Sequence, residues 1–225
     1  MSKLNSNLKK ENLYLPTPRQ SIVYRLISYL LVFPLFRLLF RGHTFGIENV
    51  PKQGSLVVVA NHGSHFDPPI LGHVLGRPIA FMAKKELFDI LFLGWVISSC
   101  GAYPVKRGSS DREALRAATA KLDSGWAIGI FLDGTRQKDG RINMPKAGAA
   151  LLAAKSGSYL LPVAITNSHR VLGKKGLFPR FFPINVLIGK PIPPPKTVKK
   201  IDLLTTTQTL QAKINMMLDQ GNLSE

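Results

Sequence analysis

Residues 55–69 read SLVVVANHGSHFDPP, an apolar run followed by a polar loop and a pair of prolines. The run at 55–60 is short, continuously apolar and rich in β-branched residues, which is typical of a strand buried on both faces. Pro68 and Pro69 suit the first turn of a helix, where backbone N–H groups need no intrahelical acceptor. Asp67 is then expected at the N-cap of that helix. The stretch therefore predicts a strand, a loop and a helix in direct succession.

The same alternation of apolar strands and helical patterns runs through the rest of the chain. Further buried strands are predicted at residues 79–83, 102–105, 127–131, 160–165 and 184–188. Helices are predicted at residues 86–97, 111–122, 146–155 and 202–219. This order predicts an α/β fold with a mainly parallel sheet covered by helices. Functional sites in such folds lie beyond the carboxyl ends of the strands.

The N-terminal part of the chain contains one long apolar run, residues 22–40. Arg25 and Arg37 leave between them an uncharged core that is shorter than the roughly 20 apolar residues of an ordinary membrane span. Pro34 is expected to kink the helix or to divide it in two. We therefore predict an N-terminal membrane-interface helical segment, kinked or made of two helices, that lies in the bilayer surface. A core helix with a cap, or a true transmembrane span, are the alternatives.

Basic residues far outnumber acidic ones, with 30 Lys and Arg against 13 Asp and Glu and a formal net charge of +17. Such a charge indicates an anionic partner, which can be anionic lipid, nucleic acid or an acidic protein. The sequence contains no recognisable nucleic-acid-binding signature, so no nucleic-acid partner is expected. We predict two parts: a basic N-terminal region with the membrane-interface helices at residues 1–42, and an α/β domain at residues 43–225.

His62 and Asp67 stand in the loop after the first predicted strand. A five-residue separation lets this loop fold so that the Asp67 carboxylate reaches one ring nitrogen of His62. An imidazole held by a carboxylate in this way can act as a general base. One alternative is that Asp67 only caps the helix; another makes Ser64 a nucleophile. A third alternative is a metal site formed by His62, His65 and Asp67.

The loop at 61–67, NHGSHFD, resembles the first motif of the glycerolipid acyltransferases, a family that includes the lysophosphatidic acid acyltransferases. Three further blocks follow in the order of that family. They are GAYPVKR at 101–107, FLDGTR at 131–136 and LPVAI at 161–165. The resemblance covers roughly residues 46–167, and four ordered blocks make it specific.

The resemblance implies a reaction. A fatty acyl group would pass from an acyl thioester, either acyl-ACP or acyl-CoA, to the free hydroxyl of 1-acyl-glycerol-3-phosphate (lysophosphatidate), giving phosphatidate in phospholipid biosynthesis. The enzyme would be a 1-acylglycerol-3-phosphate O-acyltransferase that needs no metal and no cofactor besides this co-substrate. It would work at the membrane bilayer as a peripheral or monotopic protein on the cytoplasmic face.

The resemblance also implies residue roles. His62 would deprotonate the acceptor hydroxyl and Asp67 would orient His62, with no acyl-enzyme formed. The acceptor phosphate would be bound, in a pocket shaped partly by backbone, by Lys106, Arg107, Asp133, Gly134, Thr135 and Arg136.

Two residues of the third block depart from the family pattern, which usually reads Phe-Pro-Glu-Gly-Thr-Arg. Leu132 replaces the proline, and Asp133 replaces the glutamate with a carboxylate one methylene shorter. Both changes are expected to affect acceptor preference, so glycerol-3-phosphate or another lysolipid is an alternative acceptor. The same departures are the support for a second class, a non-catalytic lipid-binding protein. A nucleic-acid-binding protein, suggested by the charge alone, is the third class.

Overall fold

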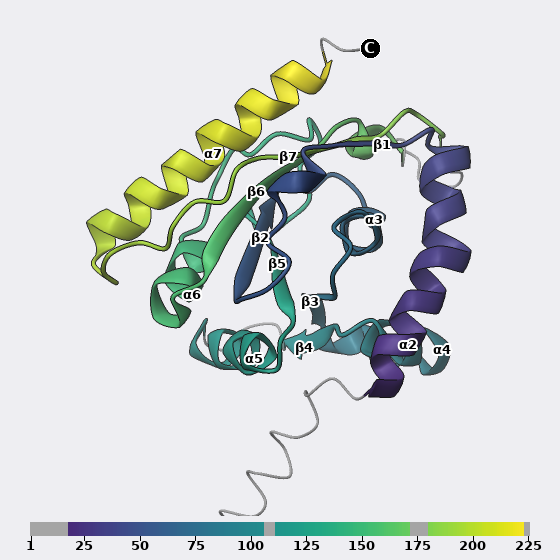
Figure 1. Cartoon of the computed structure of the whole chain (residues 1–225), viewed down its shortest axis with the longest axis horizontal. Coiled ribbons are helices and arrows are strands. Elements are labelled where there is room, and N and C mark those ends of the chain that lie inside the picture. The colour runs from purple at the N-terminus through teal and green to yellow at the C-terminus, as the bar shows by residue number, and fades with distance from the viewer. Residues whose placement is uncertain (1–17, 106–110, 172–179, 223–225) are drawn as a thin grey trace, which may run out of the picture.

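The computed structural model describes residues 18–105, 111–171 and 180–222. In these ranges seven strands form one sheet in the order β1-β7-β6-β2-β5-β3-β4 (Figure 1). All neighbouring strands are parallel except β6 and β7, which are antiparallel. The predicted α/β fold with a mainly parallel sheet is confirmed. The strands are β1 (His43–Phe45), β2 (Leu56–Ala60), β3 (Ile79–Lys84), β4 (Tyr103–Val105), β5 (Ala127–Phe131), β6 (Tyr159–Ile165) and β7 (Asn185–Ile188).

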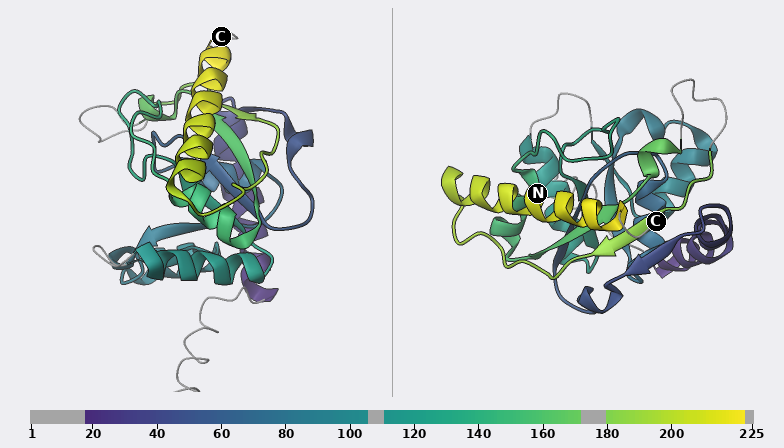
Figure 2. Two further views of the ribbon diagram at one scale, coloured as in Figure 1. Left: turned by 90° about the vertical axis from the view of Figure 1, so that its left-hand side faces the viewer. Right: turned by 90° about the horizontal axis from the view of Figure 1, so that it is seen from above.

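Helices cover both faces of the sheet (Figure 2). The α-helices are α2 (Pro18–Ile27), α3 (Asp67–Val74), α4 (Leu91–Ser99), α5 (Asp111–Asp123), α6 (Gly148–Ser156) and α7 (Lys200–Asn222). The shorter helical segments are η2 (Ser28–Val32), η3 (Leu35–Leu39), η4 (Ile47–Asn49), η5 (Lys85–Leu87) and η6 (Ser168–Arg170). All predicted strands are present within one residue of their expected ends, while β1 was not predicted because its sequence, HTF, is not an apolar run.

The prediction of one helix at 86–97 is wrong. The structure has a 3-10 turn, η5, followed by α4 from Leu91. Ile90 separates the two, because its backbone is extended with ψ at 109°. The apolar pattern runs through both segments, and such a pattern does not mark where the backbone leaves the helical conformation.

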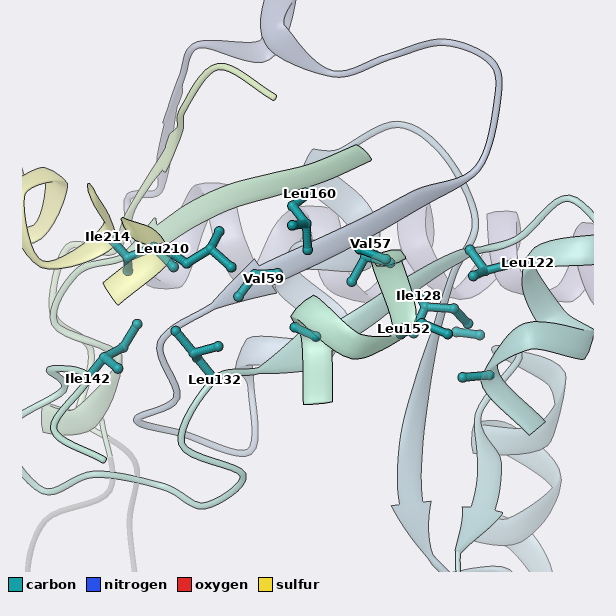
Figure 3. Close-up of a cluster of buried hydrophobic side chains, with 14 of the residues drawn as sticks. Val57, Val59, Leu122, Ile128, Leu132, Ile142, Leu152, Leu160, Leu210 and Ile214 are labelled. Carbon is teal, nitrogen blue, oxygen red and sulfur yellow. The ribbon is translucent and has the colours of Figure 1, made fainter. Parts of the chain in front are cut away.

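One buried cluster joins the first face of the sheet to α5, α6 and α7 (Figure 3). Val57 and Val59 of β2 belong to it, together with Ile128 of β5. Leu152 of α6 and Ile214 of α7 cover them, and both are almost fully buried. Because neighbouring strands point alternate residues to the same face, this half of the core is continuous across the sheet.

The second cluster joins the opposite face to α3 and to the N-terminal helix. Val58 and Ala60 of β2 contribute from the sheet, and Ile70 contributes from α3. Phe36 and Phe40 are buried in the same cluster, so the N-terminal helix packs on the α/β part of the chain. The predicted boundary between residues 42 and 43 falls just before β1 and stays a prediction.

The N-terminal helix is one unbroken helical run from α2 through η2 to η3, so the prediction that Pro34 divides it is wrong. Pro34 lies between two π-helical segments, in which Phe33 N–H donates to Ser28 O and Phe40 N–H donates to Leu35 O. These wider turns accommodate the proline ring. Within the N-terminal helix, the stretch Ile22–Leu39 is long and apolar enough to cross a membrane, judged by length and composition.

Gly129 lies in the middle of β5 beneath an aromatic ring. A Cβ atom at this position would stand 2.1 Å from Cε1 of Phe81 on β3. Phe81 in turn stacks on Phe131, with 5.5 Å between the ring centroids. The packing of these two rings therefore depends on the absence of a side chain at residue 129.

We expect Gly129→Ala to lower the free energy of unfolding by about 1–3 kcal/mol, because the added methyl group must displace the Phe81 ring in a packed region. Urea unfolding followed by circular dichroism measures this loss. Gly148→Ala is the matched control, since a Cβ there meets nothing within 4 Å and the residue lies in the first turn of α6. Equal losses in the two variants would contradict the packing argument.

Candidate active site

The central contact of the site joins His62 and Asp67. His62 Nδ1 lies 2.8 Å from Asp67 Oδ2. Asp67 is fully buried, whereas the His62 side chain keeps 16% of its surface exposed. A carboxylate accepts hydrogen bonds, so Nδ1 carries the proton and donates it to Asp67. Nε2 of the neutral ring is then free to accept a proton, which is the arrangement of a general base.

The same carboxylate oxygen folds the loop. The backbone N–H groups of Gly63 and Ser64 both donate to Asp67 Oδ2, each at 2.8 Å. The predicted N-cap role of Asp67 is wrong, because α3 begins at Asp67 itself and the carboxylate accepts from the preceding loop instead of the helix. Three donors on one buried oxygen fix the position of the carboxylate and the path of the loop.

Phe131 holds the plane of the imidazole. Its ring stacks on His62 with 3.8 Å between centroids and 11° between planes. Phe131 ends β5 and pairs with Ala60 at the end of β2, so the register of the sheet places it beside the loop. The sequence analysis quoted Phe131 only as part of the third block and assigned it no role; the parallel pairing of its strand with β2 is the signal that identifies it.

Asn61 ties the start of the loop to the neighbouring strand. Its side chain accepts from Ile165 N–H at 2.8 Å and donates to Ile165 O at 2.9 Å and to Gly140 O at 2.8 Å. The residue is 1% exposed, so each of these polar groups depends on its partner. Sequence reasoning quoted Asn61 only as part of the first block. The structure shows it fixing the backbone that carries His62.

The third-block loop lies against the His62 loop. Leu132 N–H donates to Ala60 O at 3.0 Å, and Gln137 N–H donates to His62 O at 2.8 Å. These two bonds fix both ends of residues 133–136. Gly134 has φ at 67°, a left-handed conformation that suits glycine. Thr135 and Arg136 are exposed there.

Asp133 is turned away from a ligand role. It is 4% exposed, and its two carboxylate oxygens accept the N–H groups of Met144 and Asn143 at 3.0 and 3.2 Å. A buried anion already holding the next loop does not attract a phosphate. Its part in the predicted phosphate site is therefore to shape the backbone. Leu132, the other departure from the family pattern, is a buried core residue.

Two lysines to which the sequence analysis assigned no role lie near this loop. Nζ of Lys146 would stand 3.3 Å from a Cβ placed on Gly134. Lys84 ends β3, and its charge acts on His65. Lys84 and Lys146 are therefore two cations near the site in addition to Arg136. The other predicted phosphate ligands, Lys106 and Arg107, lie outside the described residues, so their role stays a prediction.

The titration of His65 reports these charges. Burial lowers the pKa of His65 below its ordinary value, and the positive charges of Arg136 and Lys84 lower it further, partly offset by Asp67. His65 is therefore neutral at pH 7 and adds no charge of its own. Among the residues that the structure describes, no group of three His, Cys, Asp or Glu side chains is arranged to hold a metal ion.

Residues 43–166 match the family model named Acyltransferase, and the chain belongs to this family. It is 31% identical over 149 residues to the 1-acyl-sn-glycerol-3-phosphate acyltransferase of Bacillus subtilis, covering 64% of this chain and 70% of that protein. It is 30% identical over 175 residues to the chloroplastic 1-acyl-sn-glycerol-3-phosphate acyltransferase LPAT1 of Arabidopsis thaliana, covering 76% of this chain and 48% of that protein. The chain spans about half the length of this plant relative.

A solved structure has the same fold. It is the 1-acyl-sn-glycerophosphate (LPA) acyltransferase, PlsC, from Thermotoga maritima, with a TM-score of 0.75 and 28% sequence identity. The superposition covers 90% of this chain and 81% of that one. The resemblance found in the sequence motifs is confirmed, and so is the architecture that it implies.

We expect Arg136→Gln to raise the pKa of His65 toward its ordinary value, because loss of a nearby cation makes the imidazolium form less unfavourable. The pKa stays below the ordinary value, since burial is the larger cause and remains. Imidazole chemical shifts followed by NMR over pH measure the change. Lys138→Gln, which removes an exposed cation two residues along the loop, serves as the control. An unchanged His65 pKa in Arg136→Gln would show that this guanidinium does not face the site.

Proposed function

We propose that this chain transfers a fatty acyl group from an acyl thioester to the free hydroxyl of 1-acyl-glycerol-3-phosphate, giving phosphatidate. The observation that carries the proposal is the contact between His62 Nδ1 and Asp67 Oδ2, next to a loop that presents Arg136. The bacterial and plant relatives are named 1-acyl-sn-glycerol-3-phosphate acyltransferases, which supports the same acceptor.

In the first step Nε2 of His62 takes the proton of the acceptor hydroxyl while the oxygen attacks the thioester carbonyl. The imidazolium that forms is stabilised by the Asp67 carboxylate, which stays ionised. The tetrahedral intermediate then expels the thiolate, and His62 returns the proton to the leaving sulfur. The acyl group passes directly to the acceptor, so no acyl-enzyme forms and no metal or further cofactor takes part.

The acceptor phosphate is recognised by cations on the third-block loop and its neighbours. Arg136 is exposed beside the His62 loop, and Lys146 lies at Gly134. A guanidinium binds phosphate oxygens through paired N–H groups, and an ammonium adds charge. Lys106 and Arg107 complete the proposed set. Glycerol-3-phosphate and other lysolipids carry the same phosphate and remain the alternative acceptors.

The net charge of the chain supports the proposed acyl donor, and the apolar surface of its N-terminal helix supports the proposed location at a membrane. Acyl-ACP and acyl-CoA are both anionic, which suits a chain of net charge +17. The helix Ile22–Leu39 supplies an apolar element for attachment to a bilayer, as a peripheral or monotopic protein on the cytoplasmic face. The lipid acceptor is then taken from the same membrane.

We expect His62→Ala to reduce kcat for acyl transfer by about 10³-fold or more, and Asp67→Asn by a similar order, because the first removes the base and the second the group that holds it. Product formation from lysophosphatidate and acyl-CoA or acyl-ACP, read by mass spectrometry, measures the effect. His43→Ala is the matched control, since His43 is an exposed histidine on the edge strand β1. A His62→Ala variant with wild-type turnover would refute the mechanism.

We expect Arg136→Gln to lower kcat/KM for lysophosphatidate by about 10- to 100-fold, the range for losing a hydrogen bond to a charged group. The same variant is expected to leave the slow rate on monoacylglycerol, which has no phosphate, nearly unchanged. Initial rates on the two acceptors measure the difference, with Lys138→Gln as control. Equal losses on both acceptors would argue against phosphate binding by Arg136.

A further inference from the structure

Helix α4 exposes an apolar surface that the proposed reaction does not use. Leu91 is 92% exposed, Phe92 76% and Trp95 55%, and they follow one another at i, i+1 and i+4 on the helix. The sequence of α4, LFLGWVISS, contains no charged residue. Isolated exposed apolar side chains are ordinary, but three large ones on one uncharged helix indicate a surface that something covers.

This surface is next to the N-terminal helix, because α4 packs against α2 (Figure 1). The N-terminal helix also exposes large apolar side chains, among them Ile22, Leu26, Leu30 and Phe33, which recur at helical spacing. Both helices stand on the side of the molecule opposite α7 (Figures 1 and 2). Helix α4, with its exposed apolar side chains, therefore stands beside an element already long and apolar enough for a membrane.

A lipid bilayer fits this surface better than a protein. Between residues 18 and 47 the chain has four arginines and no acidic residue, which favours an anionic lipid surface. A second copy would bring another charge of +17 to the same place. An acidic carrier protein needs cations, and α4 has none. Trp95 adds a side chain that prefers the boundary between lipid and water.

The position of α4 relates this surface to the site. The helix follows β3 after the short turn η5, and β3 ends at Lys84, whose charge acts on His65. A bilayer in contact with α4 is thus close to the edge of the sheet where His62 stands. A lysolipid acceptor entering from that bilayer reaches the site with its phosphate among the cations and its acyl chain toward the membrane.

We propose that α4 is a second bilayer anchor, which inserts Leu91, Phe92 and Trp95 at the boundary between the headgroups and the acyl chains of an anionic membrane, beside the N-terminal helix. Two anchors that are not collinear fix the orientation of the site toward the bilayer, whereas a single helix leaves rotation about its own axis free. The proposed function already attaches the N-terminal helix to a bilayer, and this proposal adds α4 to that attachment. It rests on the proposed function only for the identity of the lipid that enters the site.

Tryptophan fluorescence tests the insertion directly. The chain has two tryptophans, and Trp126 is 2% exposed in the core, so Trp95 is the one that can respond to lipid. With vesicles of phosphatidylcholine and phosphatidylglycerol brominated on the acyl chains, we expect a blue shift and quenching of the full-length protein. Trp95→Phe is expected to abolish both. Protein that sediments with the vesicles while its Trp95 emission stays unquenched would overturn the proposal.

A charge in the surface tests its contribution to binding. We expect Phe92→Asp to weaken vesicle binding by about tenfold or more, because an aromatic ring that inserts into the bilayer is replaced by a charge that must remain in water. Ile201→Asp is the matched control, because Ile201 is 68% exposed on α7, across the molecule, and the same change there should leave binding unaltered. Equal effects of the two variants would overturn the proposal.

A protein bound at the α4 surface, or the absence of acyl transfer, would give results that differ from those expected for bilayer insertion. If Phe92→Asp instead dissociates a lipid-free dimer in sedimentation, or weakens binding of acyl carrier protein without changing vesicle binding, the surface serves a protein and the bilayer proposal is wrong. On lysophosphatidate dispersed as monomers, Phe92→Asp is expected to keep the wild-type rate. A wild type without activity there contradicts the proposed function, while the quenching of Trp95 still decides the anchor.

Discussion

One buried carboxylate oxygen organises the functional part of this molecule. Asp67 Oδ2 accepts a hydrogen bond from the His62 ring and two from the loop backbone, all at 2.8 Å. A carboxylate without exposed surface requires such partners, because an unpaired buried charge is very costly. The three hydrogen bonds that satisfy this oxygen therefore also fix the loop and the orientation of the His62 ring. Structure and chemistry depend on the same oxygen.

The parallel sheet brings the other parts to this oxygen. β2, β5 and β6 are neighbours and run in one direction, so the residues after each strand meet at one edge. Phe131 at the end of β5 stacks on the imidazole, and Asn61 ties the loop to β6. The loop with Arg136 is held by backbone hydrogen bonds from Leu132 N–H to Ala60 O and from Gln137 N–H to His62 O. Segments separated by about a hundred residues thus form one site because strand order makes them adjacent.

Binding to a membrane and chemistry are linked by the same architecture. The N-terminal helix buries Phe36 and Phe40 on one face of the sheet and leaves its other side apolar and exposed. Its Ser28 contacts His73 of α3, the helix whose first residue is Asp67. The N-terminal helix therefore contacts α3, the same helix into which the His62 loop leads. The proposed lipid acceptor would require such proximity, since its acyl chain would remain in the membrane while its hydroxyl attacks the thioester.

The sequence by itself determined every strand except β1, most helices and the His62–Asp67 pair, because short apolar runs and a five-residue loop are local properties of the chain. It also identified the family through four ordered blocks. Only the tertiary structure decided which neighbours these residues meet. Phe131 and Lys146 lie in segments far from His62 in the sequence, and Asn61 binds Ile165 of a distant strand. Asp133 binds the backbone ten and eleven residues further on instead of a ligand. It also decided that Pro34 is accommodated within one helix and that α4 carries an exposed apolar face. Local patterns do not contain these facts, because they arise from strand order and from packing between parts of the chain that are far apart in sequence.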